Sequence, residues 1–219
     1  MKFTIAIPCF GQAEYLPYAI ESALSQKGDI EIIVVNDGSK DNAKEIAEKY
    51  PVKLINQVNK GLPSARNTAI MNMTGEIFFP LDADDMMMDG CVEKVQEVFE
   101  KTDADIVAPS FKTFGFTNHS VILADPTLHD FIQGNYIGYF SAVKKEKLLE
   151  VGGYSPRMFW GYEDYHLWID LLKRGAKLQI IKEPLILYRT KPDGMLATAQ
   201  QHHQELMQQI FVDHPELYA

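Results

Sequence analysis

The chain is poor in cysteine and has no long hydrophobic run. Only two cysteines occur in 219 residues, Cys9 and Cys91, and both lie in apolar stretches. This spacing suggests neither a disulfide framework nor a cysteine metal site, and it is typical of a reduced protein. No apolar run approaches the roughly 20 residues of a membrane span, and Pro8 interrupts the N-terminal run too early for a signal peptide. We therefore expect a cytoplasmic protein with no transmembrane segment.

Positive charge is also scarce. The chain has 21 Lys and Arg against 30 Asp and Glu, a net charge of −9. This balance argues against the concentrated basic face that a nucleic-acid partner requires. The motifs G-x-G-x-x-G and G-x-x-x-x-G-K-[ST] are absent, which disfavours a dinucleotide-dependent dehydrogenase and a P-loop ATPase. A phosphate group bound here must be held locally, by a metal, an arginine or backbone N–H groups.

Strand-like and helix-like segments alternate in the first half of the chain. Strands are expected at 3–7, 31–35, 52–56, 76–81 and 105–109, and helices at 13–26, 41–50, 63–73 and 89–101. The alternation predicts an α/β fold with a Rossmann-like, mostly parallel sheet flanked by helices.

The regularity ends after residue 110. Here we expect a loosely alternating stretch at 111–123, strands at 139–143, 177–181 and 185–189, and helices at 144–151, 163–174 and 195–211. This pattern predicts a mixed antiparallel arrangement. We expect one domain over 1–219, with 1–110 as the nucleotide-binding half and 111–219 as the acceptor-binding half with a C-terminal helix.

Three carboxylates follow the strand expected at 76–81. They are Asp82, Asp84 and Asp85. Packed like charges repel, and their burial is costly unless a cation offsets it. Mg²⁺ or Mn²⁺ takes oxygen ligands and often shares them with a phosphate. A solvated turn leading to a helix at Asp89 is the other explanation, and the cluster alone does not decide between them.

Polar loops follow the first three predicted strands as well. In an open parallel sheet, ligands bind beyond the carboxyl ends of the strands, so the loops at 8–11, 36–41 and 59–67 should converge with the Asp cluster. Asp37 is explained either as a turn residue or as an acceptor of N–H groups from a nucleobase. Arg66 is either a surface residue or a fork of donors for a base or diphosphate. The convergence favours a binding site.

A second polar cluster lies at residues 159–168. Glu163 and Asp164 stand where a helix should begin, and negative charge is favourable there, so helix capping is one explanation. The other is functional: Trp160 offers an exposed platform for a sugar ring, and a neighbouring carboxylate takes a proton from an acceptor hydroxyl. The histidines in this half are metal ligands in principle, although histidines on amphipathic helices are more often structural. They are His166, His202 and His203.

Several short motifs occur in one order through most of the chain. They are IAIPCF at 5–10, VVNDGS at 34–39, NKG at 59–61, ARN at 65–67, LDADD at 81–85, GGY at 152–154, GYED at 161–164 and YR at 188–189. Together they resemble the family 2 glycosyltransferases of the GT-A fold. The resemblance implies an inverting hexosyl- or N-acetylhexosaminyltransferase that uses Mg²⁺ or Mn²⁺. The donor would be a nucleoside-diphospho-sugar, most commonly with uridine as the base, and the acceptor a glycan or glycolipid.

The resemblance also implies roles for individual residues. The nucleoside pocket would be lined by Pro8, Phe10, Asp37 and Arg66, and the donor would also be contacted by Asn59, Gly61 and Ala83. Asp82 would contact the ribose or donor sugar, and Asp84 would bind the metal. Asp164 would be the base and Glu163 would position the acceptor, while Trp160 and Asp85 would lie at the donor sugar or acceptor. Many relatives carry a histidine, sometimes a metal ligand, shortly after the Tyr-Arg pair. Lys191 stands in that region here and is expected to contact the diphosphate instead.

Other interpretations remain open from the residues alone. A sugar-1-phosphate nucleotidylyltransferase would share the sheet and the metal carboxylates, but its glycine-rich, arginine-containing loop is missing after the first strand. A non-catalytic nucleotide-sugar or glycan-binding module on the same fold is a further alternative. The C-terminal helix would close over the acceptor site, pack in a homodimer or touch a membrane, and its Gln- and His-rich face makes the membrane role the weakest.

Overall fold

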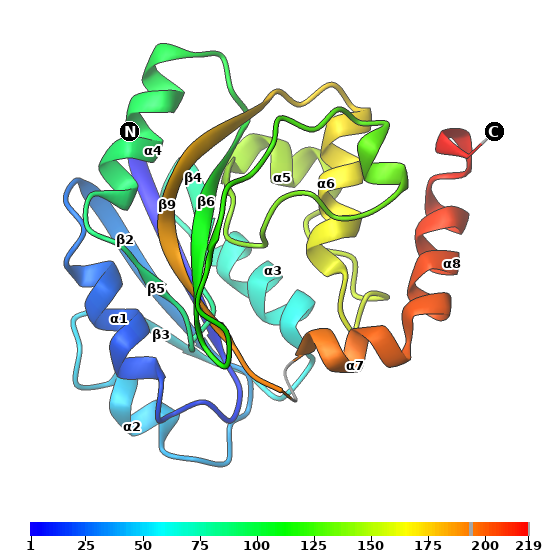
Figure 1. Cartoon of the computed structure of the whole chain (residues 1–219). Coiled ribbons are helices and arrows are strands. Elements are labelled where there is room, and N and C mark those ends of the chain that lie inside the picture. The colour runs from blue at the N-terminus through cyan, green and yellow to red at the C-terminus, as the bar shows by residue number, and fades with distance from the viewer. Residues whose placement is uncertain (193–194, 219) are drawn as a thin grey trace.

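A nine-stranded sheet lies between two sets of helices in the computed structural model, which describes residues 1–192 and 195–218 (Figure 1). The strands are β1 (Lys2–Cys9), β2 (Asp29–Asn36), β3 (Lys53–Asn56), β4 (Ile77–Pro80), β5 (Met86–Met87), β6 (Ile106–Gly115), β7 (Ser120–Val121), β8 (Ala142–Lys144) and β9 (Leu178–Thr190). The helices are α1 (Leu16–Leu24), α2 (Ala43–Ala47), α3 (Leu62–Asn72), α4 (Cys91–Lys101), α5 (Lys145–Val151), α6 (Glu163–Lys173), α7 (Met195–Gln201) and α8 (His203–Asp213), with 3₁₀ turns at Asp130–Ile132 and Pro215–Leu217.

The sheet is buried on both faces. In β1, Ile5 and Ile7 pack into the cluster that includes α1, α2 and α4, while Ala6 between them packs toward α3, α5 and α6. Figure 1 shows these two sets of helices on opposite sides of the sheet. Successive side chains of a strand point to opposite faces, so a continuous apolar run is what this position requires. The predicted mixed α/β fold is confirmed.

The strand order is β3-β2-β1-β4-β8-β6-β9-β5, with β7 paired to the side of β6. The pairs β1–β2, β1–β4, β2–β3 and β6–β9 are parallel. Antiparallel pairs join β8 to β4 and β6, β5 to β9, and β7 to β6. A strand from the second half of the chain, β8, therefore lies between β4, from the first half, and β6, which crosses residue 110.

Several predicted boundaries were wrong, and three of the differences have a clear structural cause. The strands expected at 177–181 and 185–189 form one strand, β9, because register shifts opposite Pro109 and Ser110 absorb the irregular stretch around Pro184. The C-terminal helix is divided into α7 and α8 at His202. Helix α4 begins at Cys91 rather than Asp89, because Gly90 takes the left-handed conformation (φ 75°) before it.

Both cysteines are buried and free. No helix within the described residues is both long and apolar enough to cross a membrane.

Candidate functional site

A cavity of about 470 Å³ lies at the carboxyl ends of β1, β2 and β4. It is lined by Pro8, Cys9, Phe10, Gln12, Asp37, Asn59, Gly61, Leu62, Ala65, Asp82, Asp84, Asp85, Phe159, Trp160, Tyr188, Arg189, Thr190, Lys191 and Thr198. Four predicted loops meet there, as the topology requires. Among the predicted donor residues, Ala83 is fully buried and lines neither this pocket nor the second one described below.

The three carboxylates of the Asp cluster have different surroundings. Asp82 Oδ1 accepts a bond of 2.8 Å from Arg66 Nη2, while Asp84 Oδ2 lies 2.7 Å from Lys191 Nζ. Asp85 is 1% exposed and accepts hydrogen bonds from the Tyr139 hydroxyl (2.5 Å) and the Arg189 backbone N–H (2.6 Å). Both oxygens of Asp85 thus have protein donors, and Asp84 is the carboxylate of the three that faces a lysine side chain.

Burial and mutual repulsion act on this cluster. The pKa of Asp82 is raised to about 6, mainly by loss of water and also by the charge of Asp84, while Arg66 opposes the increase. Burial, followed by the charges of Asp84 and Asp82, holds the pKa of Asp85 well above its usual range. A bound cation would relieve this repulsion. The oxygens of Asp84 are donors of the kind that a hard divalent ion takes, so the residues present fit Mg²⁺ or Mn²⁺.

Arg66 is buried and is not among the residues that line this pocket. It is 0% exposed, and its guanidinium bridges two acids, with Nη1 2.5 Å from Glu163 Oε1 and Nη2 2.8 Å from Asp82 Oδ1. The rings of Tyr139 and Tyr154 lie 4.7 and 5.3 Å from its Cζ. Arg66 therefore couples the Asp cluster to the first turn of α6, across 97 residues of sequence.

Lys191 and Arg189 form the cationic side of the pocket. The ring of Tyr15 lies 4.4 Å from both the Lys191 Nζ and the Arg189 Cζ. Arg189 Nε also donates to the backbone carbonyl of Asp84, at 2.9 Å. This side of the pocket is suited to an anionic group such as a diphosphate.

A second, adjoining pocket of about 340 Å³ contains Asp164. Its lining is Leu62, Arg66, Asp82, Phe111, Asn135, Gly138, Tyr139, Phe140, Gly161, Tyr162, Glu163, Asp164, Tyr188 and Ala199. Leu62, Asp82 and Tyr188 line both pockets. The two cavities therefore share a wall, which places a carboxylate beside the end of the larger pocket.

Asp164 is held in position by two donors. Its Oδ2 accepts a bond of 2.9 Å from Asn135 Nδ2, and its Oδ1 accepts one of 2.8 Å from the Tyr165 backbone N–H. Desolvation raises its pKa, although the positive charge of Arg66 opposes this. Tyr162, just before α6, has a left-handed backbone (φ 58°), a conformation rare for residues other than glycine. This turn directs Glu163 toward Arg66 and Asp164 into the second pocket.

Asp37 organises the loop between β3 and α3. Its Oδ1 accepts bonds from Gln57 Nε2 (2.7 Å) and the Lys60 backbone N–H (2.9 Å), and its Oδ2 accepts one from the Gly61 N–H (2.9 Å). Asp37 still lines the larger pocket, although it is only 3% exposed. The loop that it holds brings Asn59 and Gly61 to the same wall.

Gly61 is a position where the pocket requires glycine. Its φ is +85°, and a Cβ there would lie 2.6 Å from the ring of Phe159. We expect Gly61→Ala to displace Phe159 and weaken nucleotide binding by about tenfold, which corresponds to about 1.4 kcal/mol. Gly152→Ala is the matched control, because Gly152 also has a positive φ (+82°) but a Cβ there would meet no atom within 4 Å. Both variants should lose about 1 kcal/mol of stability, so equal effects on binding, measured by calorimetry, would contradict a steric role.

Trp160 is 40% exposed and lines the larger pocket. One face of its indole is covered by His202, with ring centroids 4.4 Å apart and planes 4° from parallel. His203 contacts the Tyr162 hydroxyl at 3.0 Å. The side chains of His202 and His203 thus have different partners, and that of His166 faces Asp170 and His214.

Several site residues were not predicted from the sequence. Tyr139 and Asn135 come from the irregular segment after β7, where no motif marked them. Tyr15 is an aromatic residue without a distinctive sequence context, and Phe159 lies in the cluster at 159–168 but was given no role there. Arg189 belongs to the Tyr-Arg pair, which marks it in the sequence, and in the structure it contacts the Asp cluster.

A family model described as "Glycosyl transferase family 2" matches residues 4–166 of this chain. A curated relative, the uncharacterized glycosyltransferase EpsJ of Bacillus subtilis, is 37% identical over 114 residues, 49% of this chain and 33% of EpsJ. The chain matches about a third or less of the length of each of the first three curated relatives.

Two solved structures are similar to this chain in fold. The S. aureus TarS 1–349 complex with UDP-GlcNAc has a TM-score of 0.82 at 17% identity, covering 97% of this chain and 66% of that one. The mannosyltransferase PcManGT of Pyrobaculum calidifontis, in complex with GDP-Man and Mn²⁺, has a TM-score of 0.69 at 19% identity, covering 93% and 61%. At these identities the likeness concerns the fold alone.

Proposed function

We propose that this chain, which belongs to glycosyl transferase family 2, transfers a sugar from a nucleoside-diphospho-sugar to a hydroxyl of a glycan or glycolipid. The observation that carries the proposal is the position of Asp164 in a pocket that shares the wall residue Asp82 with the larger, cation-bearing pocket. A donor and an acceptor in these two cavities would meet at that wall. The similar TarS structure contains UDP-GlcNAc, so UDP-sugars are the donors to test first.

The donor would occupy the larger pocket. Phe10, 54% exposed at the rim, offers an apolar surface to the nucleoside, and Lys191 and Arg189 offer positive charge to the diphosphate. A divalent metal held by Asp84 would neutralise charge on the departing diphosphate. Lys191 would then release Asp84 and turn to the phosphate oxygens.

The acceptor would occupy the second pocket, with its hydroxyl at Asp164. Asp164 takes the hydroxyl proton while the hydroxyl oxygen attacks the anomeric carbon. The bond from that carbon to the diphosphate breaks on the opposite face, and its electron pair leaves with the diphosphate. A single displacement of this kind inverts the configuration. Arg66, which bonds to both Glu163 and Asp82, would hold these two carboxylates close to the reacting centre.

Nucleotide binding tests this proposal. We expect calorimetry with UDP, GDP, CDP and dTDP, each with and without Mn²⁺, to identify one nucleotide that binds tightly with the metal. Asp84→Asn should weaken the metal-dependent binding at least about tenfold, and Lys191→Met should weaken binding with and without Mn²⁺, because it removes a charge from the diphosphate. Asp89→Asn is the control, since Asp89 is exposed in the same segment and lines neither pocket.

Two outcomes would contradict the proposal. If none of the four nucleotides binds, the donor pocket is wrongly assigned. If a nucleotide binds but no sugar is transferred or hydrolysed from its diphospho-sugar, the chain is a non-catalytic nucleotide-sugar-binding module.

A further inference from the structure

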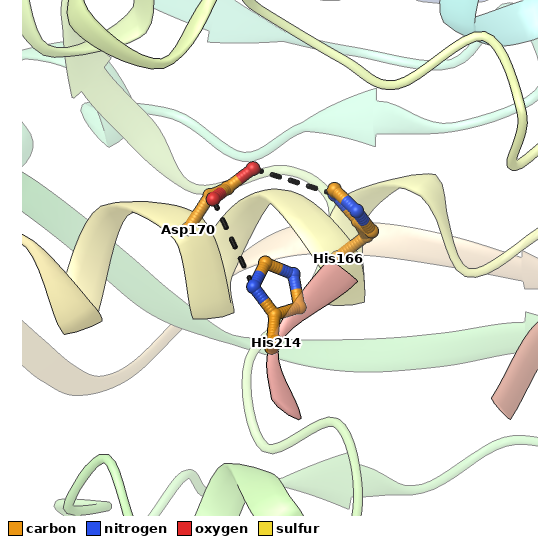
Figure 2. A group of neighbouring side chains, drawn as sticks. All are labelled: His166, Asp170 and His214. Atoms are coloured by element: carbon orange, nitrogen blue, oxygen red, sulfur yellow. Dashed lines mark ion pairs between the residues drawn. The ribbon is translucent and has the colours of Figure 1, made fainter. Parts of the chain in front are cut away.

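A buried polar cluster joins α6 to the segment that follows α8. It consists of His166 and Asp170 from α6 and His214 from just beyond α8, whose side chains point toward one another in Figure 2. His166 is 5% exposed and His214 is 1% exposed. None of the three lines either pocket of the candidate site.

The distances in this cluster are close to those of a metal site. His166 Nδ1 lies 3.6 Å from Asp170 Oδ2, and His214 Nδ1 lies 3.9 Å from Asp170 Oδ1. One ligand atom from each residue can be chosen so that all lie within 4.8 Å of one another. A tetrahedral zinc ion holds neighbouring ligand atoms roughly 3.3–3.6 Å apart. Small side-chain rotations would therefore bring the three groups onto one ion.

The hydrogen bonding of His166 leaves one nitrogen free. Its Nε2 lies 3.0 Å from Asp213 Oδ2, and Asp213 is itself paired with Arg157 at 2.9 Å. A histidine that donates from Nε2 to a carboxylate carries its lone pair on Nδ1, and this is the arrangement of many metal-bound histidines. Nδ1 of His166 is buried and has no hydrogen-bond partner among the described residues, although buried polar atoms are almost always paired. Nε2 of His214 is also buried and unpaired.

A positively charged side chain, Lys173, already lies on one side of this cluster. The Lys173 ammonium is 2.7 Å from His214 Nδ1 and 3.4 Å from Asp170 Oδ1. The lone pair of His214 Nδ1 therefore also faces the cluster. Lys173 has an alternative partner at the surface, Glu216, at 3.3 Å, so the ammonium can withdraw without losing its charge partner. A metal ion and Lys173 would exclude each other.

We propose that His166, Asp170 and His214 form a zinc site in which water completes the coordination. Two imidazoles and one carboxylate favour zinc over Mg²⁺, which takes oxygen ligands. The ion would attach the C-terminal segment to α6, the helix whose first turn carries Glu163 and Asp164. This site is independent of the oxygen-rich site at Asp84.

Zinc binding to the full 219-residue protein tests the proposal. After dialysis against a chelator, we expect calorimetry to show one Zn²⁺ per chain and thermal unfolding to move to a higher temperature with zinc but not with Mg²⁺. His214→Gln should weaken zinc binding by at least about tenfold. Lys173→Met should strengthen it, because the competing ammonium is gone. His203→Gln, an exposed histidine of α8, is the matched control.

The remaining variants keep the result interpretable. Asp84→Asn should bind zinc as the wild type does, so a loss there would place the ion in the other site and overturn the proposal. Absence of zinc binding, or equal affinities for His214→Gln and His203→Gln, would also overturn it. If His214→Gln does not fold, X-ray absorption of the zinc-loaded wild type decides, because two nitrogen ligands are expected and an all-oxygen shell contradicts the site.

Discussion

Asp164→Asn should reduce sugar transfer by about 10²–10⁴-fold, the range that a positioned general base contributes. The amide has nearly the same shape as the carboxylate but cannot accept the acceptor proton. It retains one oxygen for the Tyr165 N–H, which now accounts for the 2.8 Å bond to Asp164 Oδ1. We therefore expect nucleotide affinity and the free energy of unfolding to change little, so the loss should be in kcat.

The pH dependence of transfer gives a second measurement on the same group. Asp164 acts as a base only when ionised, and desolvation raises its pKa. The rate should therefore fall as the pH is lowered, at a pH above the ordinary range of an exposed Asp. Asp103→Asn, at a carboxylate whose side chain is 74% exposed, is the control and should leave rate and pH profile unchanged. Transfer by Asp164→Asn within about tenfold of the wild type would assign the base to another residue.

Arg66→Met should destabilise the fold by about 3–5 kcal/mol, the usual result of removing one partner from a buried ion pair. Arg66 is fully buried, and its loss would leave Glu163 and Asp82 facing each other without a counter-charge. Urea denaturation of the purified variant measures the effect. Arg174→Met, at an exposed arginine just beyond α6, should change stability by less than about 0.5 kcal/mol.

Two further variants separate charge from shape at Arg66. Arg66→Lys keeps one positive charge but not the fork that reaches both acids, so it should recover only part of the stability. In Arg66→Met/Glu163→Gln one of the unpaired charges is removed, and the double variant should be more stable than Arg66→Met alone. A loss below about 1 kcal/mol for Arg66→Met would mean that water or a rearranged side chain replaces the guanidinium.

The sequence predicted the parts of this fold that depend on local pattern. The apolar runs of β1 and β2 and the helices between them follow from periodicity, and the edge where polar loops gather follows from the direction of parallel strands. The two pieces predicted for β9 are one strand because a bulge opposite Pro109 keeps the pairing continuous. Such an irregularity depends on how β9 pairs with β6, and this pairing cannot be inferred from the sequence of β9 alone.

Within the site, the chemistry of single residues was easier to predict than the residues that they contact. The chemistry of Asp82, Asp84 and Asp164 could be inferred from the kinds of residue and their neighbours along the chain. Two contacts could not be inferred in this way: Arg66 lies between Glu163 and Asp82, and Lys191 contacts Asp84. Each of these contacts joins one half of the chain to the other. Their assigned roles in binding and catalysis stay predictions until the variants above are measured.

The position of β8 has a consequence for how the chain comes apart. Because β8 pairs with β4 on one side and β6 on the other, and β5 pairs with β9, strands from both halves are interleaved on one side of the sheet. Neither half could detach without exposing the backbone of its neighbour. Denaturant should therefore unfold both halves of the chain in one cooperative transition. A fragment ending near residue 110 would lack β8, the strand between β4 and β6, and would end within β6 itself.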